Sequence, residues 1–131
     1  MPQYTGRPAD SFGFKKIIYA KRNGRAYVTL NRPEVLNAVD GDTLIELNEA
    51  FQDAAWDDDV GVLVLTGAGD RAFCTGADVK EQAAEFVGRP DAYWKWMGLF
   101  IQCHERLRNI GIPTIARLHG MVVGGGNEFN M

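Results

Sequence analysis

Strand-favouring residues near the start of the chain predict a β-hairpin. Residues 17–21 and 25–30 are rich in Ile, Val, Tyr and Thr, which favour strands. Between these segments stands an Asn-Gly pair at positions 23–24, which readily adopts the positive φ angles of a two-residue hairpin turn. Because proline cannot donate to a strand ladder, we expect the second strand to end before Pro33.

Two amphipathic helices are expected after the hairpin. Apolar residues between positions 42 and 56 recur with the i, i+3, i+7 spacing of one helical face. Either Asp40 or Asp42 stands where a side chain can cap the first turn of that helix. Similar spacing predicts a second helix within residues 92–109, where aromatic and aliphatic residues line one side.

Two short apolar runs predict strands that are buried on both faces of a sheet. They cover residues 62–66 and 113–118, and a further helix is expected to begin near Gly125. The resulting order is strand, strand, helix, strand, loop, helix, strand, helix, which predicts an α/β fold. We expect a flexible N-terminal lead-in over residues 1–13 and one domain over 14–131.

Composition and charge narrow the function classes. The chain has 131 residues, of which 46% are hydrophobic and 24% charged, as in ordinary globular domains. A net charge of −3 disfavours nucleic-acid binding, which normally needs a basic face. No apolar run approaches the roughly 18 residues of a membrane span, and residues 1–16 contain no apolar segment of the kind found in secretion signals, so we expect neither membrane spanning nor secretion. Cys74 and Cys103 lack metal-ligand spacing, so we expect free thiols and no metal site. From the lack of a long apolar run we also expect no membrane partner and a cytoplasmic protein.

Two glycine-containing loops follow the predicted buried strands and are the main candidates for a site. They cover residues 67–78 and 119–128, and in open α/β sheets ligands collect at the carboxyl ends of strands. The first loop begins with a GxGxxA pattern that suggests dinucleotide binding. That fingerprint needs its third small residue inside a helix, whereas residues 73–76 are expected to continue as loop. The chain also opens with a hairpin instead of a βαβ unit, so we disfavour this interpretation.

The second loop can be interpreted from helix geometry. If a helix begins near Gly125, its free N–H groups favour negative charge, and glycine lets a ligand approach the backbone closely. Glu128 lies three residues on, offset by about 60° around the helix axis and ~4.5 Å along it. One segment could thus offer an oxyanion-stabilising amide with a carboxylate beside it. The alternative, also consistent with this segment, is a tight glycine turn followed by a solvated Glu128.

Four motifs in this chain stand in an order and spacing that resemble one known family. They are Asn31-Arg32-Pro33 with Leu36-Asn37-Ala38, the strand at 62–66 ending in Gly67, residues 72–81, and Pro113-Thr114-Ile115-Ala116 leading to Gly120 and residues 124–128. From about Lys16 onward the chain resembles the crotonase, or enoyl-CoA hydratase/isomerase, superfamily. The resemblance implies a crotonase-like fold built from ββα units, of which this chain would hold the N-terminal half.

The resemblance also implies chemistry on an acyl-CoA thioester. The backbone amides of Ala77 and Gly125 would form an oxyanion hole, and Glu128 would act on the catalytic water as acid and base. Ala77, Asp78, Val79 and Lys80 would lie along the bound coenzyme A, and Gly125 would also bind the substrate. Coenzyme A would be part of the substrate, and no separate cofactor is implied.

Several reactions remain open within this resemblance. Hydration of an enoyl-CoA is the leading expectation, and the alternatives are isomerisation, dehydration, ring-opening hydrolysis, or a non-catalytic fragment that binds coenzyme A. In the family's hydratases a second glutamate follows further along, which here would lie beyond Met131. We therefore expect this chain to be part of a longer polypeptide. The resemblance also implies that the longer polypeptide forms a trimer or a dimer of trimers. We assign to structure the remaining candidates, namely Cys74, His104, His119, Tyr93, Trp94, Trp96 and Phe100.

Overall fold

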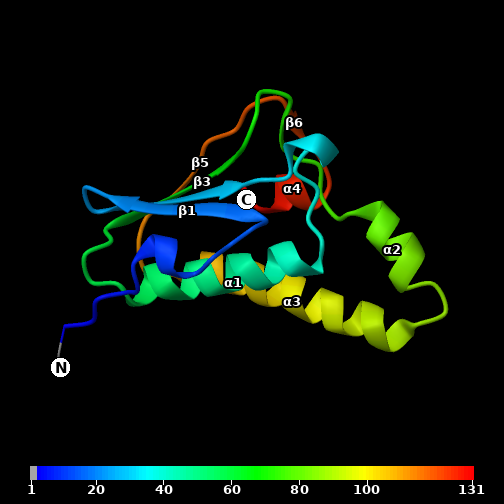
Figure 1. Ribbon diagram of the computed structural model, residues 1–131, viewed down its shortest axis with the longest axis horizontal. Coiled ribbons are helices and arrows are strands. Elements are labelled where there is room, and N and C mark those ends of the chain that lie inside the picture. Colours follow the sequence, from blue (N-terminus) through cyan, green and yellow to red (C-terminus); the bar gives the residue numbers. More distant parts are fainter. Residues whose placement is uncertain (1–2) are drawn as a thin grey trace.

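The structure is a computed structural model that describes residues 3–131, and it consists of a sheet with two long helices packed beneath it (Figure 1). The strands are β1 (Ile17–Arg22), β2 (Arg25–Leu30), β3 (Val62–Gly67), β4 (Ala72–Cys74), β5 (Thr114–Ala116) and β6 (Met121–Val122). The helices are α1 (Gly41–Trp56), α2 (Val79–Glu85), α3 (Pro90–Arg108) and α4 (Gly125–Glu128), with 3₁₀ turns at Ala9–Ser11 and Pro33–Val35. Within the described part of the chain, no helix is both long and apolar enough to cross a bilayer.

The predicted hairpin is confirmed and forms one side of a four-stranded sheet in the order β1-β2-β3-β5. β1 and β2 are antiparallel, whereas the β2–β3 and β3–β5 pairs are parallel. The hairpin turn places Asn23 at φ 53° and Gly24 at φ 76°. These two positive φ angles define the turn that an Asn-Gly pair favours between antiparallel strands. β4 and β6 form a separate two-stranded parallel sheet.

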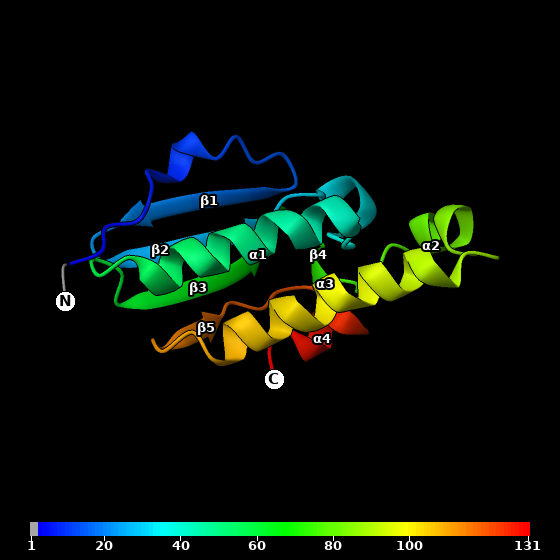
Figure 2. The same cartoon turned by 90° about the horizontal axis from the view of Figure 1, so that it is seen from below.

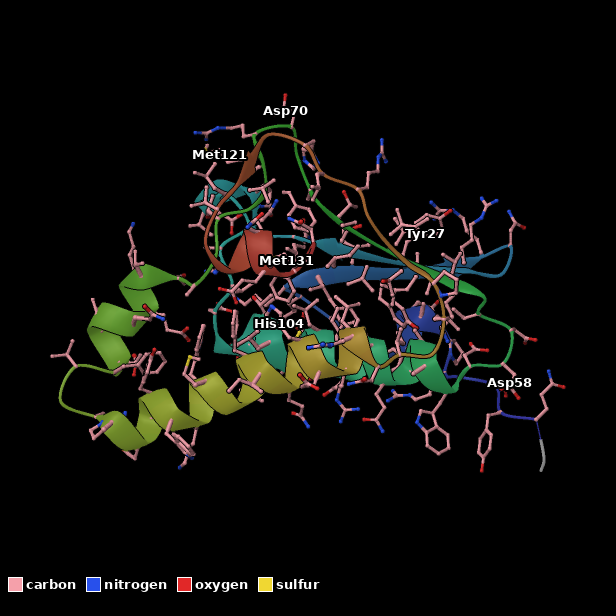
Figure 3. The ribbon with its side chains drawn as sticks, turned by 180° about the vertical axis from the view of Figure 1, so that it is seen from behind. Tyr27, Asp58, Asp70, His104, Met121 and Met131 are labelled. Carbon is pink, nitrogen blue, oxygen red and sulfur yellow. The ribbon has the colours of Figure 1, made fainter. Side chains whose placement is uncertain are left out.

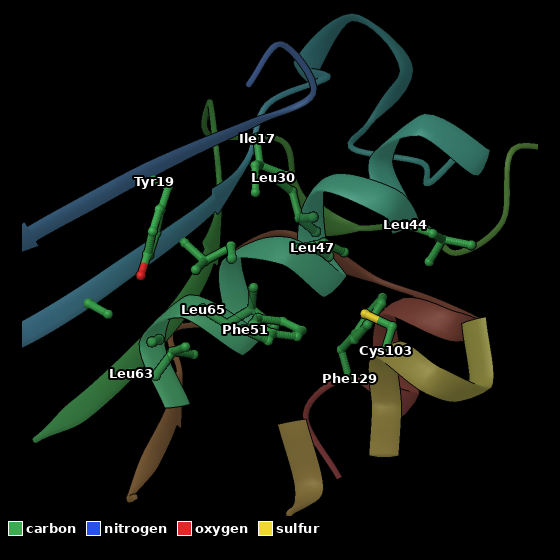
Figure 4. Packing of buried hydrophobic residues seen from close by; sticks show 14 of the residues in the cluster. Ile17, Tyr19, Leu30, Leu44, Leu47, Phe51, Leu63, Leu65, Cys103 and Phe129 are labelled. Carbon is green, nitrogen blue, oxygen red and sulfur yellow. The ribbon is translucent and has the colours of Figure 1, made fainter. Parts of the chain in front are cut away.

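The predicted first helix is confirmed as α1, and it supplies much of the hydrophobic core. Of the two candidate caps, Asp40 is the one used, since its carboxylate accepts from the Thr43 N–H at 2.8 Å. Leu44, Leu47 and Phe51 are fully buried against the sheet and α3. Figure 4 shows Leu47 near Leu30 of β2 and Phe51 near Leu65 of β3, with Leu44 further along α1, and Figure 2 shows α1 and α3 lying side by side.

Two expectations about strands were wrong. Residues 113–118 were expected to be a buried strand, but β5 covers only Thr114–Ala116 and Ile115 is 54% exposed. The reason is that β5 is the last strand in the sheet, and within residues 3–131 no strand pairs with its other edge. Residues 73–76 were expected to be loop, but Cys74 ends the buried strand β4, which pairs with β6. Because Ala72 begins this strand and not a helix, the dinucleotide fingerprint is absent.

The described part of the predicted lead-in, residues 3–13, lies against α1 and β1. The Arg7 N–H donates to Asp53 Oδ1 at 2.8 Å, and the Lys21 ammonium bridges Asp53 at 2.6 Å and Asp57 at 2.8 Å. Burial raises the pKa of Asp57, but the hydrogen bonds from Lys21 and the Asp59 N–H outweigh burial, so this pKa lies below its ordinary value. The flexibility of the lead-in stays a prediction, and its residues 1–2 lie outside the described residues.

Replacing Lys21 by methionine should destabilise the fold. The Lys21→Met variant leaves the largely buried carboxylates of Asp53 and Asp57 without their cation, a change that costs about 3 kcal/mol in comparable buried pairs. Urea unfolding followed by circular dichroism measures the change in unfolding free energy. Lys15→Met is the matched control, because the Lys15 side chain is exposed. A loss below about 0.5 kcal/mol, as for an ordinary surface substitution, would contradict the prediction.

Candidate functional site

The pairing of β4 with β6 brings the two glycine loops together. Ala72 pairs with Met121 and Cys74 with Val122, and the Val123 N–H then donates to the Cys74 carbonyl at 3.1 Å. Just beyond these strands the backbones of Gly76 and Gly125 touch. A Cβ atom on Gly76, which has φ 93°, would lie 3.0 Å from the Gly125 nitrogen. Only glycine therefore fits between the loops at position 76.

The amide of Ala77 is held at this junction by a short parallel pairing with Val39. The Val39 N–H donates to the Gly76 carbonyl at 2.8 Å, and the Asp78 N–H donates to the Val39 carbonyl at 2.9 Å. Because the residues flanking Ala77 make these bonds, its own N–H faces away from Val39. Within residues 3–131 the Ala77 N–H donates no hydrogen bond.

The amide of Gly125 lies at the beginning of the expected helix, which is confirmed as the single turn α4. Gly124 precedes it with φ 55° and ψ −128°, so the chain turns sharply into the helix. The N–H groups of Gly126 and Asn127 donate to the carbonyls of Val123 and Gly124. The Gly125 N–H has no such acceptor in the described part of the chain. Two unbonded N–H groups, on Ala77 and Gly125, thus lie on adjoining segments.

Glu128 ends α4 and is exposed. Among residues 3–131 its carboxylate forms no ion pair. The side chain borders a cavity of about 650 Å³ between α4, α3 and the edge of the sheet. His104 and Met131, both labelled in Figure 3, line the same cavity. Apolar lining is contributed by Leu65, Leu107, Ile112, Ile115 and Phe129.

Asp78 is engaged in the protein itself. Its carboxylate caps α2 by accepting from the N–H groups of Lys80 at 3.0 Å and Glu81 at 3.2 Å, and it pairs with Arg32 at 3.0 Å. Burial raises the pKa of Asp78, but these hydrogen bonds and the Arg32 charge outweigh burial and hold the pKa below its ordinary value. Val79 and Lys80 are exposed on α2. Contacts of these three residues with coenzyme A stay a prediction.

Asn37 and Arg32 contribute to the site, although the sequence indicated no role for either. Asn37 is 1% exposed and donates to the carbonyls of Ala68 at 3.0 Å and Ala72 at 2.9 Å. Its own Oδ1 accepts from the Arg32 N–H at 3.0 Å. These bonds tie the turn after β2 to the first glycine loop. Both residues belong to motifs that supported the family resemblance, namely Asn31-Arg32-Pro33 and Leu36-Asn37-Ala38. The motifs did not indicate what either residue does.

The aromatic and sulfur-containing candidates have mostly structural environments. Trp96 is buried and stacks on Phe100 at 5.4 Å, whereas Trp94 is 79% and Tyr93 45% exposed, so the structural packing expected of these two residues was wrong. Nothing within residues 3–131 covers Trp94, which points from α3 into solvent. Burial raises the pKa of the Cys74 thiol to about 11, which keeps it protonated and unreactive near neutral pH. The described residues bring no group of three His, Cys, Asp or Glu side chains together as metal ligands.

His104 is packed as a structural residue beside the cavity. Its Nδ1 lies 2.8 Å from the Phe100 carbonyl, and its ring stacks on Phe129 with centroids 4.4 Å apart. The ring thereby connects α3 to the residue that follows α4. His119 lies in the loop before β6.

The fold is mixed α/β, with two unbonded backbone N–H groups on touching loops and a carboxylate three residues beyond the second of them. The chain belongs to the Enoyl-CoA hydratase/isomerase family, whose pattern it matches over residues 20–131. It is therefore a member of the crotonase superfamily, and its fold is the crotonase-like α/β fold that the sequence motifs predicted.

Solved structures of this family superimpose closely on the chain. An enoyl-CoA hydratase/carnithine racemase from Magnetospirillum magneticum is 32% identical, with a TM-score of 0.82, and the match covers 88% of this chain and 43% of that one. An enoyl-CoA hydratase/isomerase from Xanthobacter autotrophicus Py2 is 34% identical, with a TM-score of 0.81 and coverage of 88% and 43%. An enoyl-CoA hydratase from Mycobacterium smegmatis is 31% identical, with a TM-score of 0.82 and coverage of 88% and 44%. The chain thus spans less than half the length of these structures.

Proposed function

We propose that the protein processes acyl-CoA thioesters and adds water across the double bond of an enoyl-CoA. The observation that carries this proposal is the pair of unbonded N–H groups on Ala77 and Gly125, on loops that touch. A thioester oxygen that accepts from both would be stabilised as it gains enolate charge. Each fixed donor of this kind contributes roughly 3 kcal/mol to lowering a barrier.

Glu128 is the acid/base group in this proposal. Its carboxylate takes a proton from water while the water oxygen bonds to the β-carbon of the enoyl group, and the α-carbon then takes up a proton. The double bond is converted to a single bond and no electrons are transferred to another molecule. The reaction therefore needs no cofactor beyond the coenzyme A of the substrate. We also propose homo-oligomeric assembly and a cytoplasmic location, as in the expectations from sequence.

A second candidate is isomerisation, dehydration or ring-opening hydrolysis of a cyclic acyl-CoA. It is favoured by the Phe100 ring, whose edge lies against the Gly125 backbone: a Cβ on Gly125 would be 3.0 Å from the ring. Trp96 stacks on Phe100. An aromatic ring against one of the two proposed donors would suit a cyclic acyl group.

Product analysis of the full-length protein should distinguish these candidates. We expect crotonyl-CoA to gain the mass of one water and cyclic enoyl-CoA thioesters to remain unchanged. Conversion of cyclic thioesters alone would favour the second candidate. If neither substrate reacts while calorimetry detects binding of acyl-CoA, the protein is a non-catalytic module and the proposal is wrong.

A further inference from the structure

The guanidinium of Arg32 forms hydrogen bonds with both segments that hold the Ala77 amide. Its Nη1 donates to the Ala38 carbonyl at 2.7 Å, and its Nη2 donates to Asp78 Oδ2 at 3.0 Å. The same Nη2 lies 3.4 Å from Asp40. The side chains of Arg32 and Asp78 are only 13% and 14% exposed, so these charge-assisted bonds form largely out of water.

The partners of Arg32 flank the pairing that orients Ala77. Ala38 directly precedes Val39, and Asp78 directly follows Ala77, while Val39 bonds to Gly76 and Asp78 on either side. One planar side chain therefore spans both members of this short parallel pairing. The backbone of Arg32 is itself fixed by Asn37, whose Oδ1 accepts its N–H at 3.0 Å. The direction of the Ala77 N–H thus depends on a chain of bonds that begins at Arg32.

We propose that Arg32 is a positioning residue that holds the Ala77 N–H in the direction needed to donate to a thioester oxygen. This inference rests on the proposed function, because it assigns to Arg32 an effect on the oxyanion hole. Lysine cannot replace arginine in this role. A single ammonium lacks the rigid fork by which a guanidinium bonds two acceptors in one plane.

The Arg32→Lys variant of the full-length protein tests the proposal through the bound carbonyl. The probe is butyryl-CoA carrying carbon-13 at the thioester carbonyl, which has no double bond to hydrate. Hydrogen bonds from the two amides should lower its infrared stretching frequency below the value in water. In Arg32→Lys the frequency should return toward that value. The kcat for crotonyl-CoA should fall about 10- to 100-fold, because small misplacements of a catalytic group have effects of this size, whereas KM should change little.

Arg22→Lys is the matched control, since Arg22 lies at the hairpin turn with its guanidinium 4.0 Å from the Tyr27 ring. It should keep the wild-type frequency and kcat. If Arg32→Lys does not fold, Asp78→Asn replaces it, because asparagine can still cap α2 but loses the ion pair. An unchanged frequency in whichever folded variant is measured overturns the role of Arg32. If the frequency is not lowered in the wild-type protein, the proposed function itself fails.

Discussion

Glu128→Gln should lower the kcat for hydration of crotonyl-CoA by about 10²- to 10⁴-fold, the range that general acid–base catalysis contributes. Glutamine keeps the size and shape of the side chain but cannot take a proton from water at neutral pH. The turn of α4 should be unaffected, because its bonds are formed by the backbone and Glu128 is exposed. Binding of butyryl-CoA, measured by calorimetry, should therefore stay close to that of the wild-type protein.

Glu49→Gln provides the matched control for this loss. Glu49 is exposed on α1, outside the segments that form the site, and the same chemical change there should leave kcat unchanged. Turnover of Glu128→Gln within a few-fold of the wild-type value would remove Glu128 from the mechanism. A loss of butyryl-CoA binding together with turnover would show instead that the substitution disrupts the fold of the site.

Gly125→Pro should lower kcat by about 10²- to 10³-fold, as removal of one oxyanion-hole donor does in other enzymes. Proline lacks the backbone N–H, so the substitution deletes the proposed donor itself. Gly125 is the first residue of α4, and proline is well tolerated at the first position of a helix. Stopped-flow or steady-state assays with crotonyl-CoA measure the change.

Gly125→Ala separates the loss of the donor from the added bulk. Alanine also places a Cβ 3.0 Å from Phe100 Cζ, so any cost of displacing that ring is shared by both variants. Alanine nevertheless keeps the N–H and should retain most of the activity that proline loses. Equal activities of the two variants would mean that the Gly125 N–H does not contribute to the reaction.

Elements with local signals were predictable from sequence. The Asn-Gly turn at 23–24 and the apolar spacing of α1 gave both elements within one or two residues, because their bonds join near neighbours in the chain. β4 and β6 had no such signal, because they contain only three and two residues. They form strands by pairing with each other across a long stretch of the chain. Burial of Ile115 was overestimated because an apolar run does not reveal whether its strand is at a sheet edge.

The candidate site was predictable in part for the same reason. The start of a helix at Gly125, with Glu128 one turn further on, followed from the local glycine pattern and from helix geometry. The neighbouring amide of Ala77 was expected only from the family resemblance, because no periodicity relates the two loops. The bond between Arg32 and Asp78 joins residues that are 46 positions apart, and neither motif reveals it by itself.

The short β4–β6 pairing has a consequence for the energetics of ligand binding. Few backbone hydrogen bonds hold the two loops together, so this junction should open locally more often than the buried β2–β3 pair, which runs over six residue pairs. A thioester oxygen bonded to both Ala77 and Gly125 would bridge the loops and bind only the closed form. By thermodynamic linkage, the ligand then suppresses the opening. Slower amide hydrogen exchange at Val123, whose N–H joins the loops, would accompany the binding of acyl-CoA.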